Sequence, residues 1–468
     1  MVTQTKPISA VRTTGIYCRD GCSATPLRRN TMHYPSGVAA EAAGYRPCLR
    51  CRPDRLPAAI SGNGVALVER ALLLIAEGAL DDETEDALAG QLGVTARHLR
   101  RIFEDHVGAT PAFVARSRRA HFARRLLDES DLPVLDIAYA AGFASVRQMN
   151  RVMQSVFRFS PRELRAKRRD ADRLVADGGL CLRMPYASPF SFDDMLAYLR
   201  PRAIPGVEHV GDRAYHRTIS AHGDPGAIEI SDAGDGRHLL VVAHLPTMQS
   251  LIDDVARCRR VFGLDRHPAG GTPLADDSML RGLVAARPGL RVPGAWDPFE
   301  VSIRILLGQQ ISVPAATTLA GRLVQSLGTP VRGLGALSLT HLIPPATRIA
   351  EASLDRLRKI GLPEARAESI RAFARAYAAD RLRFDAAVEL PAILDALQEL
   401  PGVGPWTAHM IALRAAGQPD AFPAGDLGLR RAAARLTGRD TVSAAELEEL
   451  SEAWRPHRSL AAMHLWAS

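Results

Sequence analysis

Hydrophobic positions follow three successive patterns along this chain. After a linker near residues 56–64 that contains proline and glycine, apolar residues recur at helical spacing. Residues from about 180 to 285 instead combine short alternating runs, AIEIS and HLLVVAHL, with the helical run TMQSLIDDVARCRRVFGL, and residues 288–468 return to helical spacing. With 468 residues, the chain is too long for a single core. The pattern therefore predicts a multidomain protein that is mainly α-helical and contains one α+β domain.

Two segments of the first helical region share one pattern, in which a short helix, a glycine turn and a second helix follow one another. Gly93 occupies the turn of the first copy and Thr95 is the predicted N-cap after it. Gly142 and Ser145 hold the same places about fifty residues later. Helix-turn-helix units of this kind place their second helix in the major groove of DNA. An ordinary helical bundle with glycine turns is the alternative.

The two copies together resemble the AraC-type DNA-binding domain. Met149 and Met153 stand where that family usually has aromatic residues, and Arg158 stands where it usually has glycine. The resemblance implies that polar side chains of the two second helices contact bases or phosphates. The candidates are Arg97, His98, Arg100 and Arg101 in the first copy, and Arg147, Gln148, Asn150 and Arg151 in the second.

Four of the six cysteines lie in two closely spaced pairs near the N-terminus, Cys18-x3-Cys22 and Cys48-x2-Cys51. In a cytosolic chain such a cluster indicates metal binding before it indicates disulfides. Four thiolates from two pairs can surround Zn²⁺ tetrahedrally, with Zn–S distances of about 2.3 Å. We therefore expect one zinc ion per chain at these cysteines. On spacing alone, a purely structural zinc site is the alternative to a reactive one.

The segments around these cysteines, AVRTTGIYCRDGC and YPSGVAAEAAGYRPCLRCRPD, resemble the N-terminal domain of the Ada-type adaptive-response proteins. In that family the first cysteine accepts a methyl group from a DNA methylphosphotriester, and the matching residue here is Cys18. Zinc keeps sulfur as a thiolate, and methylation removes one negative charge facing the DNA backbone. The resemblance therefore implies that methyl transfer also acts as a switch. The nearby arginines that could meet phosphates are Arg19, Arg28, Arg29, Arg46, Arg50 and Arg52.

Positive charge is concentrated in this same part of the chain. Residues 1–170 contain 26 Lys and Arg against 18 Asp and Glu, whereas residues 171–468 contain 33 of each, so the whole net charge of +8 lies in the first third. A basic segment suits a polyanionic partner such as DNA. The sequence has neither an apolar run long enough to span a bilayer nor the apolar core of a signal peptide, so a cytoplasmic location is expected.

The stretch LPGVGPWTAHMIALRAAGQPDAFPAGD, residues 400–426, begins with a glycine turn between two helical runs. Gly402 and Gly404 permit positive φ and close backbone approach, and Pro405 suits the first turn of the following helix. Amide groups at the start of that helix can hold a DNA phosphate without reading the base sequence. The pattern is that of a helix-hairpin-helix.

The hairpin and the loop after it resemble the helix-hairpin-helix DNA glycosylases. The order of segments from LRMPYASPFSFDDMLAYLRPRAIPGVEHV onward resembles AlkA-type DNA-3-methyladenine glycosylases, with a TBP-like α+β domain ahead of an all-α domain. The catalytic carboxylate of that superfamily corresponds to Asp426, and Asp420 is the nearby competitor. Such a carboxylate stabilises the oxocarbenium-like charge that develops at C1′ as the base leaves. Simple N-capping of the next helix is the alternative role for Asp426.

The resemblance also implies a pocket in which an extruded, electron-poor base stacks on aromatic rings. The matching positions are Trp406, Met410, Leu427 and Trp466. Met410 and Leu427 stand where the best-known relative has aromatic residues, and this difference leaves the range of bases open. Packing in the core is the alternative role for the tryptophans.

Three smaller inferences accompany this resemblance. Family members often bind a monovalent cation through hairpin carbonyls, which implies such a site at LPGVG. Gln309 or Gln310, in the GQQIS turn, either faces DNA or forms buried hydrogen bonds. Bifunctional relatives form a Schiff base through a lysine where Trp406 stands, and no lysine follows Lys359, so lyase activity is not expected.

Together the resemblances predict four domains: a zinc domain over 1–57, an AraC-type domain over 62–169, an AlkA-like N-terminal α+β domain over 178–287 and a helix-hairpin-helix glycosylase domain over 288–468. They imply a monofunctional DNA glycosylase fused to a methyl acceptor and a transcriptional activator. The expected partners are double-stranded DNA, both damaged and operator, and RNA polymerase, and the chain is expected to act as a monomer away from membranes. The rival hypothesis is a transcriptional regulator whose zinc and glycosylase-like parts are only structural or bind DNA.

Overall fold

The computed structural model describes residues 8–468 apart from residues 20, 25–26, 54–65, 82, 175–178 and 267. The chain folds into two compact units. The N-terminal unit contains the residues up to Ala187 together with Arg237–Ala256, and the C-terminal unit contains Ser188–Gly236 and Arg257–Ser468. The predicted boundaries at residues 57, 62 and 178 lie outside the described residues, and the division into four domains stays a prediction.

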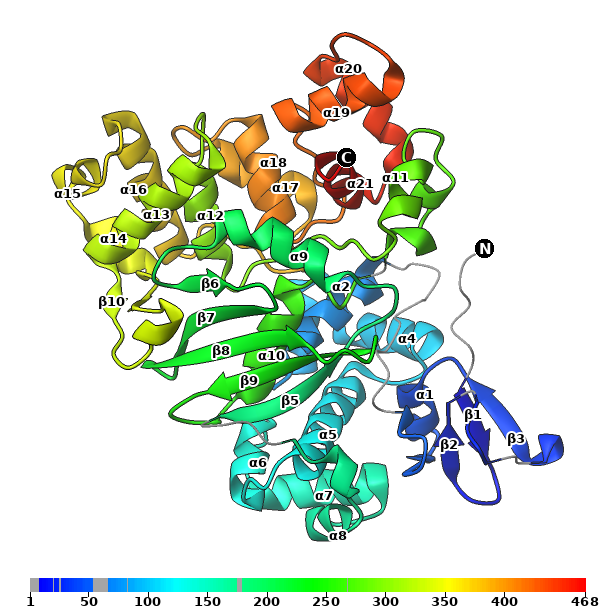
Figure 1. Cartoon of the computed structure of the whole chain (residues 1–468). Coiled ribbons are helices and arrows are strands. Elements are labelled where there is room, and N and C mark those ends of the chain that lie inside the picture. The colour runs from blue at the N-terminus through cyan, green and yellow to red at the C-terminus, as the bar shows by residue number, and fades with distance from the viewer. Residues whose placement is uncertain are drawn as a thin grey trace. The chain divides into compact units, whose positions relative to one another are not determined.

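The N-terminal unit begins with a small four-stranded sheet and one helix (Figure 1). The elements are β1 (Ile8–Val11), β2 (Ile16–Cys18), β3 (Thr31–Tyr34), α1 (Gly37–Ala42) and β4 (Arg46–Pro47). The strand order is β3-β1-β2-β4, with β1 antiparallel to both neighbours and β2 parallel to β4. Ala10, Tyr17 and Ala40 form a small buried apolar cluster, and the half-buried Ile8, Tyr34 and Tyr45 pack against it. A core this small needs a further source of stability, such as a metal ion.

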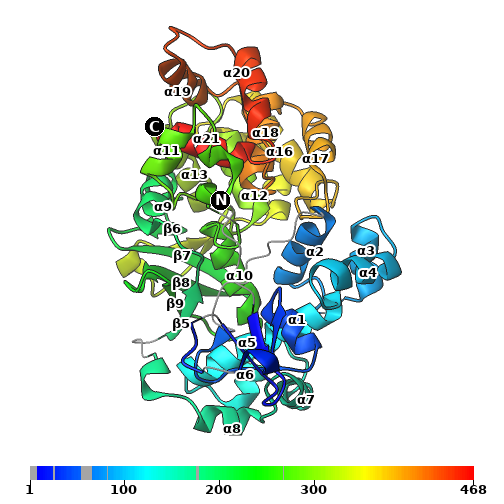
Figure 2. The same ribbon diagram turned by 90° about the vertical axis from the view of Figure 1, so that its right-hand side faces the viewer.

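A helical region follows in the same unit, and Figure 2 shows its helices α3 and α4 side by side. Its helices are α2 (Ala66–Ala76), α3 (Glu85–Gln91), α4 (Ala96–His106), α5 (Pro111–Glu129), α6 (Val134–Ala140), α7 (Val146–Phe157) and α8 (Pro161–Ala166). The predicted caps are confirmed, because Thr95 and Ser145 accept hydrogen bonds from the amides of His98 and Gln148 at the starts of α4 and α7. Both turn glycines have φ near +72°. The structure therefore contains two helix-turn-helix units, α3–α4 and α6–α7.

The structure of α6–α7 accounts for its unusual residues. Met149 and Met153 lie on the buried face of α7 and are fully buried, so their flexible thioether side chains pack inside the domain. Arg158 is the left-handed C-cap of α7, with φ of 64°, the conformation for which glycine is usually chosen. Its guanidinium donates a hydrogen bond to the Gly44 carbonyl, a contact that glycine cannot make.

The predicted α+β region is found, and its strands are shared between the two units. In the N-terminal unit, β5 (Leu180–Pro185) pairs antiparallel with β9 (His238–His244). In the C-terminal unit, β6 (Glu208–Val210), β7 (Ala214–Ala221) and β8 (Asp224–Asp232) form an antiparallel meander beside α9 (Phe192–Leu199). The helical run over 247–264 contains α10 (Leu251–Val261). The alternation read in HLLVVAHL is confirmed, because alternate residues of β9 are buried.

The remainder of the C-terminal unit is helical apart from one pair of two-residue strands, β10 (Thr329–Pro330) and β11 (His341–Leu342). Its helices are α11 (Arg281–Ala286), α12 (Pro298–Leu307), α13 (Val313–Leu327), α14 (Ala346–Glu351), α15 (Leu354–Lys359), α16 (Glu364–Ala378), α17 (Leu390–Gln398), α18 (Pro405–Arg414), α19 (Leu427–Thr437), α20 (Ala444–Ser451) and α21 (Arg458–Trp466). One continuous apolar core joins them and includes Leu306, Phe373, Leu413 and Leu460. Within the described residues, no helix combines the length and apolar character needed to cross a bilayer.

The predicted hairpin joins α17 to α18. Gly402 has φ of 77°, and a Cβ at this position would overlap the Ser369 hydroxyl and lie 3.0 Å from Ser369 Cβ. Gly404 differs from the expectation of positive φ, because its φ is −86° and it forms the N-cap of α18. No atom lies within 4 Å of a Cβ built at Gly404, so this glycine leaves the start of the helix open. Pro405 opens α18, as predicted.

The two glycines should respond differently to alanine. We expect Gly402→Ala to lower the free energy of unfolding by about 2 to 4 kcal/mol, because the left-handed backbone and the overlap with Ser369 both oppose a Cβ. Gly404→Ala is the matched control and should cost less than about 1 kcal/mol, the usual penalty for alanine at an N-cap.

All four tryptophans of the chain lie within residues 288–468, so denaturant unfolding followed by tryptophan fluorescence reports on this region. Equal destabilisation by the two substitutions would contradict the inference that only Gly402 needs a left-handed backbone and the absence of a Cβ.

Candidate functional site

The Asp426 side chain is held by three neutral N–H groups. As the N-cap of α19 it accepts a hydrogen bond from the Leu429 amide at Oδ1 (3.0 Å). The indole of Trp466 also donates to Oδ1 (2.9 Å), and the indole of Trp406 donates to Oδ2 (3.2 Å). The N-capping role therefore exists, but it occupies only part of the carboxylate. Asp426 is half-buried, so it is neither sealed in packing nor free in solvent.

Distant segments bring the two tryptophans to this carboxylate. Trp406 is the second residue of α18, directly after the hairpin, and Trp466 is the last residue of α21. Both rings are half-buried and pack against the apolar core with their nitrogens toward Asp426. Core packing and contact with the site are therefore combined in each tryptophan.

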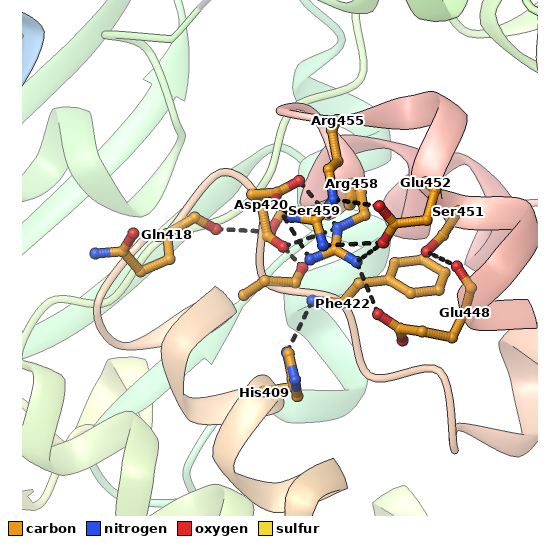
Figure 3. A network of polar contacts seen from close by, with 11 residues as sticks. His409, Gln418, Asp420, Phe422, Glu448, Ser451, Glu452, Arg455, Arg458 and Ser459 are labelled. Carbon is orange, nitrogen blue, oxygen red and sulfur yellow. Dashed lines mark hydrogen bonds and ion pairs between the residues drawn. The ribbon is translucent and has the colours of Figure 1, made fainter. Parts of the chain in front are cut away.

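Asp420 has a different environment from Asp426. Figure 3 shows its carboxylate against the guanidinium groups of Arg455 and Arg458. Arg458 donates to both Asp420 oxygens, at 2.9 and 3.2 Å, and Arg455 pairs with Oδ2. In the part of the chain that the structure describes, no cation pairs with Asp426. Asp420 is thus paired with two guanidinium groups, whereas Asp426 is held by neutral donors.

The remaining predicted pocket residues are less closely tied to the carboxylate. Met410 lies one helical turn after Trp406 on α18 and is half-buried against the core. Leu427 follows Asp426 and is 54% exposed. Both side chains are apolar and make no hydrogen bond to the carboxylate, and their pocket role stays a prediction.

Sequence reasoning missed Gly428, which borders the site. A Cβ at this position would lie 3.0 Å from Asp426 Oδ1 and 3.3 Å from the Trp466 ring. A glycine in the first turn of a helix costs roughly 1 kcal/mol relative to alanine, and this unusual choice was the available signal.

The Gln309 side chain forms hydrogen bonds to the hairpin and to the first turn of α18. Its amide nitrogen donates to the Gly402 carbonyl (2.8 Å) and lies 2.9 Å from the Thr407 hydroxyl. Of the two roles that the sequence left open, Gln309 therefore has the internal one. Gln310 is exposed and has φ of 57°.

The four cysteines of the N-terminal unit converge as predicted. The sulfurs of Cys18, Cys22, Cys48 and Cys51 all lie within 4.8 Å of one another. Tetrahedral zinc with Zn–S bonds of about 2.3 Å places its sulfurs about 3.8 Å apart, so the cluster has the size of a zinc site. Cys18 and Cys48 are buried, at 7% and 8% exposure, whereas Cys22 and Cys51 are half-buried.

The protonation of these thiols also fits a cation. A hydrogen bond from Cys18 lowers the pKa of Cys51 to about 5. The same contact, together with burial, raises the pKa of Cys18, and burial raises the pKa of Cys22. Negative charges on neighbouring sulfurs repel one another, and this repulsion keeps some of the thiols protonated. A bound zinc ion supplies positive charge and would favour deprotonation of all four.

The predicted DNA-contacting arginines lie on the second helix of each helix-turn-helix unit. Arg97 and Arg101 are exposed one turn apart on α4, and Arg147 and Arg151 are exposed one turn apart on α7. Arg100, another candidate, instead forms an ion pair with Glu85 of α3.

Buried polar contacts that join β2 and α1 to α5 were not predicted. The Glu41 carboxylate, 1% exposed, accepts a hydrogen bond from the hydroxyl of Tyr17, the residue before Cys18 (2.6 Å). From α5, the Ser117 hydroxyl and the His121 ring each lie 2.6 Å from the same carboxylate. Such pairings depend on tertiary structure, and the sequence carries no signal for them.

Arg52 corrects one prediction. It was expected to meet phosphates, but its side chain is 6% exposed and pairs with Asp128 of α5 and with Asp172 (3.2 Å). Its guanidinium is therefore used inside the protein, and the residue after Cys51 connects the cysteine cluster to α5.

Comparison with known proteins gives four family matches in chain order. Residues 4–54 match the metal binding domain of Ada, and residues 88–167 match a helix-turn-helix domain. Residues 181–297 match the AlkA N-terminal domain, and residues 303–456 match the HhH-GPD superfamily of base excision DNA repair proteins.

The chain is similar to relatives over its full length and over its C-terminal part. It is 40% identical over 466 residues to the "Probable bifunctional transcriptional activator/DNA repair enzyme AlkA" of Mycobacterium tuberculosis (strain H37Rv), covering 98% of this chain and 92% of that protein. It is 30% identical over 279 residues to DNA-3-methyladenine glycosylase 2 of Escherichia coli, covering 59% of this chain and 94% of that protein.

Among solved structures, the 3-methyladenine DNA glycosylase of Archaeoglobus fulgidus aligns with a TM-score of 0.53 and 23% identity, over 61% of this chain and 97% of that one. At this identity the likeness shows the fold of the region. The full-length similarity, the four matched domains and their order lead to one conclusion: the chain belongs to the family of the bifunctional transcriptional activator/DNA repair enzyme AlkA.

Proposed function

We propose that this protein removes alkylated purines of the 3-methyladenine type from DNA by hydrolysing the N-glycosidic bond, with Asp426 as the catalytic carboxylate. The observation that carries the proposal is the geometry of Asp426, whose charge is oriented by two indole N–H groups and an amide and, among the described residues, is not paired with a cation. The family supports the same reading, since relatives bear the names of 3-methyladenine glycosylases.

The proposed chemistry needs a fixed negative charge and little else from the protein. As the bond from C1′ to the base nitrogen breaks, positive charge develops on the sugar, and the Asp426 carboxylate stabilises it electrostatically and orients the attacking water. An alkylated purine such as 3-methyladenine is already cationic and leaves with its bonding electrons. Lyase chemistry is not part of the proposal, because Trp406 stands where bifunctional relatives have lysine.

DNA binding is assigned to the hairpin and to the pocket residues. The open start of α18 at Gly404 is proposed to hold a phosphate, and an extruded base is proposed to enter beside Trp406, Met410, Leu427 and Trp466. The predicted monovalent cation gains no support from this geometry, since the Gly402 carbonyl already accepts a hydrogen bond from Gln309.

In the N-terminal unit, Cys18 is proposed as the methyl acceptor. Bound zinc keeps cluster sulfurs deprotonated. The Cys18 sulfur attacks the methyl carbon of a methylphosphotriester, a new S–CH₃ bond forms, the O–CH₃ bond breaks, and the phosphate oxygen keeps the electron pair and the negative charge. The cluster then carries one negative charge less toward DNA, and the affinity for DNA rises.

The partners that follow are damaged and operator DNA, contacted through Arg97, Arg101, Arg147 and Arg151, and RNA polymerase, with the chain acting as a monomer. A cytoplasmic location accords with these partners. The alternative is a regulator whose glycosylase-like part only binds DNA, and the first experiment below decides between the two.

Asp426→Asn should lower the rate of base release by at least about a hundredfold, because the charge that stabilises the transition state is lost. Asparagine is as good an N-cap as aspartate, so the fold should persist. The measurement is release of 3-methyladenine from alkylated DNA with the enzyme in excess. Binding to operator DNA should be unchanged.

Asp440→Asn serves as the matched control, since Asp440 is an exposed carboxylate that follows α19. It should release the base at the wild-type rate. A wild-type protein that releases no alkylated base would establish the regulator alternative, and an active Asp426→Asn protein would remove Asp426 from its proposed role.

Methyl transfer should label a single cysteine. After zinc-loaded protein is incubated with DNA that carries methylphosphotriesters, peptide mass spectrometry should find one added methyl group on Cys18. Because Cys22 and Cys51 are more exposed than Cys18, every cluster peptide must be mapped, and Cys258 outside the cluster is the internal control. A methyl group on another cluster cysteine would overturn the assignment, and none at all would leave a structural zinc site.

Zinc content should follow the cluster. We expect one zinc ion per chain by elemental analysis, falling to nearly none in Cys48→Ala, because a tetrahedral site with three thiolates binds the ion far more weakly. The tryptophan fluorescence of the variant should remain that of the wild type, since all four tryptophans lie within residues 288–468. Full zinc content in the variant would show that the metal is bound elsewhere.

A further inference from the structure

Helix α21 contacts the loop that carries Asp426 at both of its own ends. At its C-terminal end, Trp466 donates to Asp426. At its N-terminal end, Arg458 and Ser459 bind residues 418–421 of the same loop (Figure 3). Eight residues of α-helix rise about 12 Å, so the helix holds the loop at two well-separated points.

Arg458 makes the most extensive of these contacts. Its side chain is 3% exposed, and its Nε donates to the Asp420 carbonyl (3.1 Å) and to Asp420 Oδ1 (2.9 Å). Its Nη1 donates to Glu448 (2.8 Å) and lies 3.3 Å from a Glu452 oxygen. The planar fork of a guanidinium can serve both sides at once, whereas the single ammonium of lysine cannot.

Backbone contacts complete the attachment of the loop. The Ser459 amide donates to the Pro419 carbonyl (2.9 Å), and the Ser459 hydroxyl lies 2.7 Å from the carbonyls of Gln418 and Ala421. The Phe422 amide donates to His409 Nδ1 (3.1 Å), from α18. Residues 415–426 have no regular secondary structure, so these side chains take the place of a helix or sheet in fixing the backbone.

We infer that Arg458 is a positioning residue for the glycosylase reaction: by binding Asp420 and clamping residues 418–421, it fixes the loop that sets the direction of the Asp426 carboxylate. The inference rests on the proposed catalytic role of Asp426. It adds a function for Arg458 and Asp420, neither of which touches the reacting atoms. A displacement of about 1 Å at a reacting group can cost roughly a hundredfold in rate, so loss of the Arg458 contacts should have a measurable effect.

The test compares Arg458→Met, Asp420→Asn and the double variant in the full-length protein. We expect each single variant to release 3-methyladenine ten- to a hundredfold more slowly with the enzyme in excess, while the Kd for the alkylated DNA changes by less than twofold. The double variant should be no slower than the slower single variant, because both substitutions break the same contact. Arg439→Met is the matched control, since Arg439 forms an exposed ion pair with Glu446, and it should retain the wild-type rate.

Asp426→Asn in the same assay distinguishes failure of the positioning role of Arg458 from failure of the catalytic role of Asp426. If Asp426→Asn is inactive while folded Arg458→Met has the wild-type rate, the positioning role of Arg458 is wrong and the proposed function stands. If it remains active, the proposed role of Asp426 fails. Rate losses that multiply in the double variant would also overturn the inference, because Arg458 and Asp420 would then act separately.

Tryptophan fluorescence shows whether each variant is folded, and Ser459→Ala decides the matter if Arg458→Met is not. This smaller change removes only the hydroxyl that lies against the Gln418 and Ala421 carbonyls. It should slow base release at least threefold at unchanged DNA affinity, and a wild-type rate would overturn the inference.

A pH profile adds a readout that general loss of stability does not produce. His409 Nδ1 must be unprotonated to accept the Phe422 amide, and burial lowers the pKa of His409. Of the charged groups around it, Arg458 and Arg455 also lower this pKa, whereas Glu448 and Asp420 raise it. The acid limb of the rate should therefore move to higher pH in Arg458→Met and to lower pH in Asp420→Asn, and coincident limbs in all three proteins would contradict the coupling.

Discussion

The proposed role of Asp426 requires a carboxylate that is not paired with a cation and whose direction is nevertheless fixed. Asp426 meets this requirement with neutral donors, namely the Leu429 amide and the indoles of Trp406 and Trp466. A guanidinium would hold the group more strongly but would cancel the negative charge that the proposed reaction uses. Its place at the start of α19 adds the favourable field of the helix dipole. Asp420, six residues earlier, is held in the opposite way, by ion pairs with Arg455 and Arg458.

This requirement links the hairpin to the site. The left-handed turn at Gly402 sets where α18 begins, and Trp406 is the second residue of that helix. Gln309 fixes the same turn through the Gly402 carbonyl. The element proposed to hold the DNA strand and the ring that orients the carboxylate therefore belong to one short rigid segment. A displacement of the hairpin would move Trp406, and with it one of the donors to Asp426.

The sequence was sufficient wherever structure is encoded locally. The caps at Thr95 and Ser145 follow from side chains a few residues from the amides that they bind, and the cysteine pairs follow from their spacing. Contacts between distant residues had no such signature. Arg52 and Asp128 are 76 residues apart and Arg458 and Asp420 are 38 apart, so neither pair could be read from a pattern. The predicted positive φ of Gly404 was wrong for a related reason. The sequence indicates that a glycine is needed at this position, but it does not show whether the need is for a positive φ or for the absence of a side chain.

Contacts between distant residues also limit what the net charge of the sequence indicates about DNA binding. The excess of +8 lies in the first 170 residues, yet several arginines there are paired internally. Arg52 and Arg124 share Asp128, and Arg118 pairs with Asp81 and Asp253. Opposite charges in contact largely cancel at a distance, so such a pair contributes little to the field that DNA meets. The four exposed arginines proposed to contact DNA on α4 and α7 form no ion pair within the described residues, so their charge is not offset by a neighbouring carboxylate.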